Sequence, residues 1–275
     1  MTGMPGDTAT PAASAVAVSA LTKCFGTLTA VDHISLDVPQ AAIFGLLGSN
    51  GAGKTTVIKM LTTLIAPTSG SAAVAGLDVV RNPQAVRRHI GYVSQMLSAD
   101  GEMSGYENLL ISAKLYGIRR SERAQRIEQA LKFMELAAVA DKLVSHYSGG
   151  MIRRLEIAQA MLHRPQVLFL DEPTVGLDPV ARRAVWQRIR DLRDEFGTTI
   201  VLTTHDMSEA DELCETVGFM HLGRLEAVGT PATLKAEIGP AATLDDVFIH
   251  FTGTSIGERG DYQDVARVRH TAERL

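Results

Sequence analysis

Apolar residues follow two patterns along the chain, one typical of strands and one typical of amphipathic helices. Ile34–Val38 alternates apolar and polar residues, as a half-buried strand does. Ala42–Leu47 is a continuous apolar run, which is typical of a buried parallel strand. Strand character returns at Val167–Leu170 and at Thr199–Thr203. The pattern therefore predicts several strands that are spread over most of the chain.

Helical spacing of apolar residues separates these strands. One predicted helix face follows the glycine-rich stretch that begins at residue 48, and it comprises Val57, Leu61, Leu64 and Ile65. A second face precedes Gly197, which suits a helix C-terminus, and it comprises Val185, Ile189, Leu192 and Phe196. Strands that alternate with helices predict an α/β fold with a mostly parallel sheet covered on both faces. A short strand pair is expected around Gly223.

Changes in composition and hydrophobic pattern along the chain suggest four segments. Residues 1–14 are rich in Pro, Gly, Thr, Ala and Ser and are expected to form a disordered tail. The main domain is expected over residues 15–230. Residues 96–150, approximately, are charged with a helical period and lack β-branched runs, which indicates an inserted α-helical subdomain. Residues 231–275 are expected to form a polar, largely helical C-terminal extension.

Composition narrows the classes of partner. The formal net charge is −4 and the pI is about 6.1, so nothing indicates a nucleic-acid partner, which usually needs a basic stripe. The two cysteines lie far apart and fit no metal-ligand spacing, which favours a reducing cytosol. We find no apolar segment long enough to span a bilayer. A role at a membrane would therefore require a partner.

A phosphate-binding loop is the first motif that carries chemistry. Residues 48–55 satisfy the pattern G-x-x-x-x-G-K-[ST], between an apolar run and a helical pattern. Glycines let such a loop curl so that backbone N–H groups point at phosphate oxygens, and the following helix adds its positive N-terminus. Lys54 supplies a charge to the outer phosphates and Thr55 a hydroxyl to Mg²⁺. The predicted phosphate contacts are Gly48, Ser49, Asn50, Gly51, Ala52, Gly53, Lys54, Thr55 and Thr56.

Two carboxylates, Asp171 and Glu172, stand where the apolar run Val167–Leu170 ends. Open α/β sheets bind ligands at this carboxyl edge. Adjacent strand residues point to opposite sides, so the two acids need not share a role. We predict that Asp171 helps to hold Mg²⁺ and that Glu172 polarises an attacking water. An acidic pair alone is more often a solvated turn, so this assignment depends on the phosphate loop upstream.

A third motif, Ser148-Gly149-Gly150, precedes an amphipathic helix. A hydroxyl, bare N–H groups and a helix N-terminus again make an anion-binding arrangement. One nucleotide needs only one phosphate cradle, so the second is explained if it serves the nucleotide of another copy. An ordinary Ser-capped helix start is the alternative.

Taken together, these motifs resemble those of the ATP-binding cassette ATPases over roughly residues 15–230. The matching elements, in the family's order, are Phe25, the phosphate loop, Gln95 in Tyr92-Val93-Ser94-Gln95, Ser148-Gly149-Gly150, Asp171-Glu172, Gly176-Leu177-Asp178 and Thr203-Thr204-His205. The resemblance implies a RecA-like P-loop NTPase core with an antiparallel β part and an inserted helical subdomain. It also implies that two copies enclose two ATP–Mg²⁺ head to tail.

The resemblance further implies roles for single residues. Phe25 stacks on adenine, Gln95 contacts Mg²⁺ or the water, Asp178 organises the loop at the dimer interface, and His205 hydrogen-bonds the γ-phosphate. The expected catalytic residues are Glu172, His205 and Gln95. The expected Mg²⁺ contacts are Thr55, Gln95 and Asp171. The expected contacts to the partner's nucleotide are Ser148, Gly149 and Gly150.

The third motif departs from the commonest family signature, Leu-Ser-Gly-Gly-Gln. Tyr147 and Met151 occupy the flanking positions, so no side-chain amide is available at 151. Tyr-Ser-Gly-Gly-Met followed by Arg-Arg and Leu-Glu is similar to the ATPase subunits of drug and antibiotic exporters, of the ABC-2 type and daunorubicin-resistance-like. Leu244–Gly253 looks like the tail motif of the same subgroup.

The function implied by the resemblance is ATP hydrolysis that powers efflux of a drug, antibiotic, lipid or similar compound. A separate transmembrane permease, a homodimer or heterodimer of ATPase subunits, and the cytoplasmic face of the membrane are implied with it. A soluble non-transport cassette ATPase is the alternative, although the long coiled-coil insert or second cassette of that class is missing. A guanine-reading Asn-Lys-x-Asp motif is also missing, which argues against a GTPase.

Overall fold

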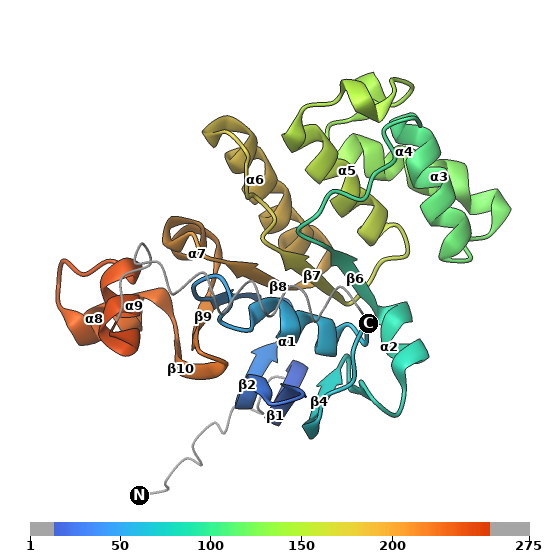
Figure 1. Cartoon of the computed structure of the whole chain (residues 1–275). Coiled ribbons are helices and arrows are strands. Elements are labelled where there is room, and N and C mark those ends of the chain that lie inside the picture. Colours follow the sequence, from blue (N-terminus) through green and yellow to red (C-terminus); the bar gives the residue numbers. More distant parts are fainter. Residues whose placement is uncertain (1–13, 254–275) are drawn as a thin grey trace, which may run out of the picture.

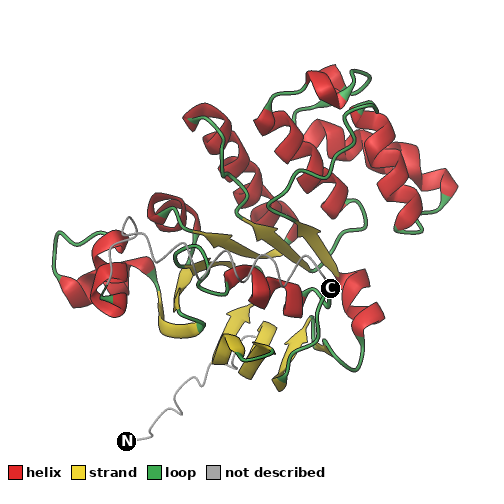
Figure 2. Ribbon diagram, viewed as in Figure 1, coloured by secondary structure: helices red, strands yellow, loops and turns green. Residues whose placement is uncertain are grey.

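The computed structural model describes residues 14–253, which form two β-sheets and the helices around them (Figures 1 and 2). Residues 1–13 and 254–275 lie outside the described part, so the predicted disordered tail and the end of the C-terminal extension lie outside it too. The first strand begins at Ser14, the last residue of the predicted tail, so that prediction is wrong at this residue.

A six-stranded sheet forms the centre of the molecule, in the order β10-β9-β3-β8-β7-β6. The five strands from β9 to β6 are parallel and β10 is antiparallel. The strands are β3 (Ile43–Leu47), β6 (Ile90–Val93), β7 (Val167–Asp171), β8 (Thr199–Thr204), β9 (Thr216–His221) and β10 (Arg224–Gly229). Every residue of β3, β7 and β8 is buried, as continuous apolar runs predict for strands covered on both faces.

A smaller antiparallel sheet has the order β2-β1-β4-β5. Its strands are β1 (Ser14–Phe25), β2 (Leu28–Pro39), β4 (Ser69–Val74) and β5 (Leu77–Asp78). Burial alternates over 34–38 within β2, as the sequence pattern predicts. Helix α1 (Lys54–Leu61) lies between the two sheets, and its Val57 and Ile58 share one apolar core with Phe44 and Phe169 of the parallel sheet.

A second apolar core covers the opposite face of the parallel sheet. The remaining helices are α2 (Pro83–His89), α3 (Gly105–Leu115), α4 (Arg120–Phe133), α5 (Gly149–Met161), α6 (Pro179–Phe196), α7 (Met207–Leu213), α8 (Pro231–Ile238) and α9 (Leu244–Thr252). Helices α3 to α5 lie together at the upper right of Figure 1, where the inserted subdomain is predicted, and α5 extends past residue 150, the predicted end of that subdomain. Ser104 and Glu107 make a reciprocal capping box that fixes the start of α3. The observed α/β fold confirms the predicted class.

Two apolar residues of the predicted helix faces are exposed rather than buried. Helix α1 ends at Leu61, so Leu64 lies beyond the helix and outside the core. Phe196 is the last residue of α6, where its ring packs edge-on against Phe133 of α4 instead of against the sheet. Gly197 does cap α6, in the left-handed conformation that glycine favours.

The described part of the C-terminal extension is less polar than its sequence suggests. Helix α9 buries Val247 and Phe248, and the Phe248 ring lies 6.1 Å from that of Phe219 in β9. Among residues 14–253, no helix is both long and apolar enough to cross a membrane.

Candidate active site

The phosphate loop connects β3 to α1 and is shaped by close backbone contacts. A Cβ on Gly53 would lie 2.5 Å from the Ala30 carbonyl oxygen, and the positive φ of Gly53 (105°) also favours glycine. Gly53 precedes α1 without a side-chain cap, so the first N–H groups of the helix have no side-chain partner there. Free N–H groups at a helix N-terminus suit a phosphate group.

Lys54 is buried at the start of α1. Its Nζ donates to the carbonyl oxygens of Gly48 (2.7 Å) and Ser49 (3.1 Å) and lies 3.8 Å from Glu172 Oε1. Burial lowers the pKa of Lys54, and the nearby carboxylates of Glu172 and Asp171 oppose this shift. A buried ammonium group beside the glycine-rich phosphate loop is suited to bind an anionic ligand.

Asp171 ends β7 and is almost completely buried. Its Oδ1 accepts hydrogen bonds from the hydroxyls of Thr55 (3.3 Å) and Thr203. The structure thus joins Thr55 to Asp171, two of the residues predicted to contact Mg²⁺. A hydroxyl and a single carboxylate fit this ion, which binds hard oxygen ligands and usually completes its shell with water and substrate phosphates.

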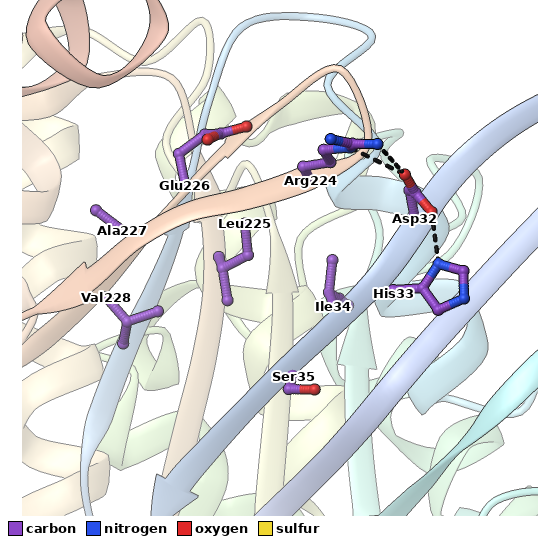
Figure 3. Close-up of a pocket in the computed structure, with 9 residues that line it drawn as sticks. All are labelled: Asp32, His33, Ile34, Ser35, Arg224, Leu225, Glu226, Ala227 and Val228. Atoms are coloured by element: carbon purple, nitrogen blue, oxygen red, sulfur yellow. Dashed lines mark hydrogen bonds and ion pairs between the residues drawn. The ribbon is translucent and has the colours of Figure 1, made fainter.

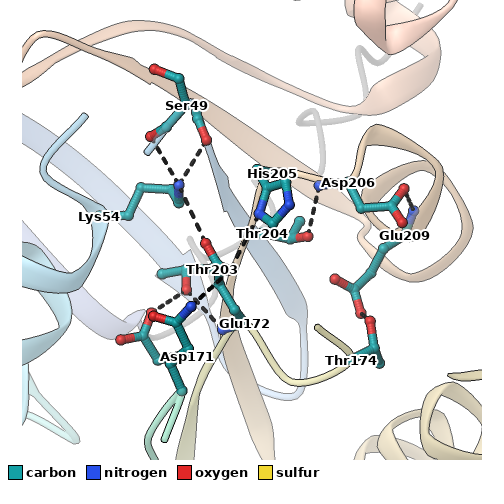
Figure 4. A network of polar contacts seen from close by, with 12 residues as sticks. Ser49, Lys54, Asp171, Glu172, Thr174, Thr203, Thr204, His205, Asp206 and Glu209 are labelled. Atoms are coloured by element: carbon teal, nitrogen blue, oxygen red, sulfur yellow. Dashed lines mark hydrogen bonds and ion pairs between the residues drawn. The ribbon is translucent and has the colours of Figure 1, made fainter. Parts of the chain in front are cut away.

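The predicted catalytic residues meet at Glu172, which Figure 4 shows with His205 and Lys54. Its Oε2 lies 3.4 Å from Gln95 Nε2 and 3.2 Å from His205 Nδ1. Gln95 follows β6, and His205 follows β8, so three strand ends of the parallel sheet supply the cluster. The side chains of Asp171 and Glu172 contact different partners, Thr55 and Thr203 for the first and Gln95, His205 and Lys54 for the second.

The backbone of Glu172 has an unusual conformation. Its φ of +49° lies in the left-handed region, which is sparsely populated by residues other than glycine. The Glu172 amide donates to the backbone oxygen and the side-chain oxygen of Thr203, both at 3.1 Å. Thr203 therefore contacts both acids, through the Asp171 carboxylate and the Glu172 amide, and fixes the backbone where β7 ends. Backbone strain of this kind concentrates at functional sites.

A second group of predicted residues lies at the start of α5 and α6. Ser148 caps α5 by accepting from the Met151 amide (3.3 Å), and Asp178 caps α6 by accepting from the amides of Val180 and Ala181. A Cβ on Gly150 would lie 2.7 Å from the Cβ of Ala181, so glycine permits the two helix starts to touch. Ser148 itself is exposed.

These two groups are separate within one chain. Among residues 14–253, no hydrogen bond or ion pair joins Ser148, Gly149 or Gly150 to Lys54 or Glu172. Phe25 is also apart, at the end of β1, where its ring is partly exposed and lies 5.1 Å from Lys23 Nζ. An exposed ring is available for stacking.

Sequence reasoning did not assign a buried network beside this site. Glu209 of α7 is almost fully buried, and its Oε1 accepts from the Thr174 hydroxyl (2.6 Å) and from Trp186 Nε1 (2.9 Å). Thr174 follows Glu172 by two residues, and Glu209 follows His205 by four. A glutamate within a short helix gives no sequence signal of burial, so only the fold reveals this link.

A groove of about 740 Å³ opens elsewhere, between β2 and β10 (Figure 3). Arg224 crosses one end of it to bind Asp32, with 2.8 Å between Nη2 and Oδ2. The predicted nucleotide contacts do not line this groove, so it is distinct from the phosphate loop.

Comparison with known proteins identifies the family. Residues 31–175 match the family model described as ABC transporter. The daunorubicin/doxorubicin resistance ATP-binding protein DrrA of Streptomyces peucetius is 42% identical over 225 residues, which cover 82% of this chain and 68% of DrrA.

Solved structures agree with this result. An ATP-binding subunit of an ABC transporter aligns with a TM-score of 0.76 at 27% identity, over 86% of this chain and 99% of that one. The ATP-binding cassette MJ0796, in a dimeric post-hydrolysis state bound to ADP and Pi, aligns with a TM-score of 0.70 at 25% identity, over 78% of this chain and 98% of MJ0796. The chain therefore belongs to the ABC transporter family, as an ATP-binding ATPase similar to the drug-resistance subgroup.

Proposed function

We propose that this chain powers an exporter by hydrolysing ATP at the cytoplasmic face of a membrane, together with a separate transmembrane permease. The observation that carries the proposal is the convergence of Lys54, Gln95 and His205 on the Glu172 carboxylate, beside the phosphate loop. The likeness to DrrA, a daunorubicin and doxorubicin resistance protein, supports a drug or similar compound as cargo.

In this proposal, hydrolysis depends mainly on positioning and charge. The phosphate loop and Lys54 bind the phosphates, and Glu172 accepts the proton of a water aligned with the γ-phosphate. His205 and Gln95 orient the γ-phosphate and the water. Thr55, Asp171 and Gln95 would hold Mg²⁺, which supplies charge neutralisation to the phosphates. Phe25 stacks on the adenine ring.

We further propose that two subunits, identical or different, dimerise head to tail so that Ser148 serves the nucleotide of the partner. The exposure of Ser148 and its separation from Lys54 within one chain support this arrangement. MJ0796, which shares the fold, is dimeric in its ADP-bound structure. Asp178 adjoins the same surface through its cap on α6 and would order the loop between the two sites.

Replacing Ser148 with Arg tests the shared site. A bulky cation at the start of α5 should abolish ATP hydrolysis, whereas the isolated subunit should bind ATP as before because its phosphate loop is intact. Mixing Ser148→Arg with Lys54→Ala should restore one composite site per dimer, measured as ATPase activity. Ser121→Arg, at an exposed position of α4, is the charge control. Full activity of Ser148→Arg alone would refute a role toward the partner.

The loop after Gln95 is the proposed contact to the permease. Met96 is 81% exposed and Leu97 is 55% exposed, and both follow a residue that contacts Glu172. Tyr106 and Met103 are half-buried, whereas Leu109 is fully buried and packs in the core, so it is not available to a partner. Apolar side chains exposed beside the hydrolysis site suit a partner helix.

Charge substitutions in this loop test the exporter function. Met96→Glu and Leu97→Glu should leave basal ATPase activity intact and abolish efflux when the chain is expressed with its permease, because docking alone is disturbed. Val80→Glu is the control, since Val80 is also 55% exposed but lies on a different segment. Membrane association and substrate efflux are the measurements. A protein that stays cytosolic, with efflux unchanged by its deletion, would favour the soluble non-transport ATPase.

A further inference from the structure

Helix α5 carries two charged side chains on its buried face. Arg153 and Glu156 are each only 3% exposed, and Arg153 Nη1 lies 3.0 Å from Glu156 Oε2. Burial lowers the pKa of Arg153, while the carboxylates of Glu156 and Asp171 oppose the shift. Buried charges are costly unless they are paired and hydrogen-bonded. Apolar residues of similar volume would fill the same space, so the ion pair calls for a reason beyond packing.

Both side chains also hydrogen-bond the loop after β6. Arg153 donates from Nη1 to the Ser94 carbonyl (2.7 Å) and from Nη2 to the Gln95 carbonyl (3.0 Å). Glu156 Oε1 accepts from the Ser98 amide and from the Ser98 hydroxyl (3.1 Å). The two side chains therefore hold both ends of the segment 94–98, and we refer to Arg153 and Glu156 as the α5 clasp.

The position of the clasp along α5 connects it to two parts of the site. Arg153 follows Ser148 by five residues, which corresponds to about 7.5 Å along a rigid helix. The loop that it holds carries Gln95, whose side-chain amide lies 3.4 Å from Glu172 Oε2. The guanidinium fork is planar and directional, so it fixes the two carbonyl groups in direction as well as in distance.

We propose that Arg153 and Glu156 are positioning residues for ATP hydrolysis: through the α5 clasp, the helix that begins at Ser148 holds Gln95 at the Glu172 carboxylate. This inference rests on the proposed roles of Gln95 and Ser148. It connects Gln95 of one site and the Ser148 cradle of the other to the same helix, α5. A shift of α5 when Ser148 meets the partner's nucleotide then moves the Gln95 loop as well.

A double-mutant cycle separates positioning from a structural role. The variant Arg153→Met/Glu156→Leu removes both charges together, a replacement that buried ion pairs often tolerate. We expect kcat to fall by about tenfold to 10²-fold, as misplacement of a catalytic group does, with KM for ATP nearly unchanged. In a Gln95→Ala background, the same double substitution should lower kcat by less than about twofold, because the clasp acts through Gln95.

Two further variants make the test specific. Arg153→Lys keeps the charge beside Glu156 but lacks the fork, so it should fold and recover only part of kcat. Arg154→Met is the matched control, because Arg154 donates to the Met134 carbonyl (2.9 Å) and contacts Glu135 instead of the loop. Its kcat should stay within about twofold of the original in both backgrounds. Thermal melting of each variant confirms folding.

The possible results are distinguishable. Equal losses of kcat from the clasp variant in the two backgrounds, or full kcat in the clasp variant or in Arg153→Lys, would overturn the positioning role. If Gln95→Ala alone leaves kcat unchanged, the proposed role of Gln95 fails and the clasp fails with it. The double-mutant cycle is measured as ATPase activity of the isolated chain. A defective permease contact, which would abolish efflux, therefore does not affect its result.

Discussion

Glu172→Gln should lower ATP turnover by about 10²–10⁴-fold while ATP still binds, because the change keeps the shape of the side chain and removes the proposed general base. The carboxylate lies within reach of Gln95, His205 and Lys54, all of which the amide would leave in place. With hydrolysis blocked, ATP should hold two subunits together. Steady-state ATPase activity and gel filtration with ATP–Mg²⁺ are the measurements.

A matched substitution shows whether the loss of turnover comes from removing Glu172 itself or from removing any one carboxylate. Glu128→Gln, on the exposed side of α4, should hydrolyse ATP at the unchanged rate and remain monomeric after turnover. Should Glu172→Gln elute only as a monomer with ATP–Mg²⁺, both the base assignment and the shared-site dimer would lose their support.

Lys54→Ala should weaken ATP binding by about tenfold or more, since hydrogen bonds to charged groups contribute about 1.5–3 kcal/mol each. The ammonium group already sits at the carbonyls of Gly48 and Ser49, at the edge of the loop. Its removal also leaves the buried Glu172 without its nearest cation. Titration calorimetry with ATP measures the affinity directly.

Lys59→Ala provides the comparison for this variant, because Lys59 lies on the exposed side of the same helix. We expect its ATP affinity to equal that of the unmodified chain. An affinity of Lys54→Ala as high as that of Lys59→Ala would contradict the assignment of the phosphate loop. Circular dichroism of both variants establishes that the overall helix content is unchanged.

A sequence pattern is most informative for residues whose chemistry is local. The phosphate loop needs glycines, a lysine and a hydroxyl at fixed spacing, so its residues are visible in the chain itself. Strand ends were also predictable, because apolar runs locate the buried strands, and the residues directly after parallel strands gather at one carboxyl edge of the sheet. The contacts of Glu172 with Gln95 and His205 agree with that rule.

Contacts between distant segments were not predictable in the same way. Arg153 binds a loop that precedes it by almost sixty residues, and nothing in its neighbours along α5 indicates burial. Phe196 fits the apolar face of α6 by spacing, yet the helix extends past the sheet and the ring meets Phe133. Periodicity reports which side of a helix is apolar, but not how far the covering surface extends.

The network around Glu209 has a practical consequence. Trp186 is the single tryptophan in the sequence, and its indole N–H is bonded to a carboxylate that also holds Thr174, close to Glu172. All tryptophan emission from the protein therefore arises from one ring, in one defined environment beside the proposed hydrolysis site. The unlabelled protein thus contains a built-in optical reporter, with which stopped-flow fluorimetry can follow the loop after Glu172 in real time.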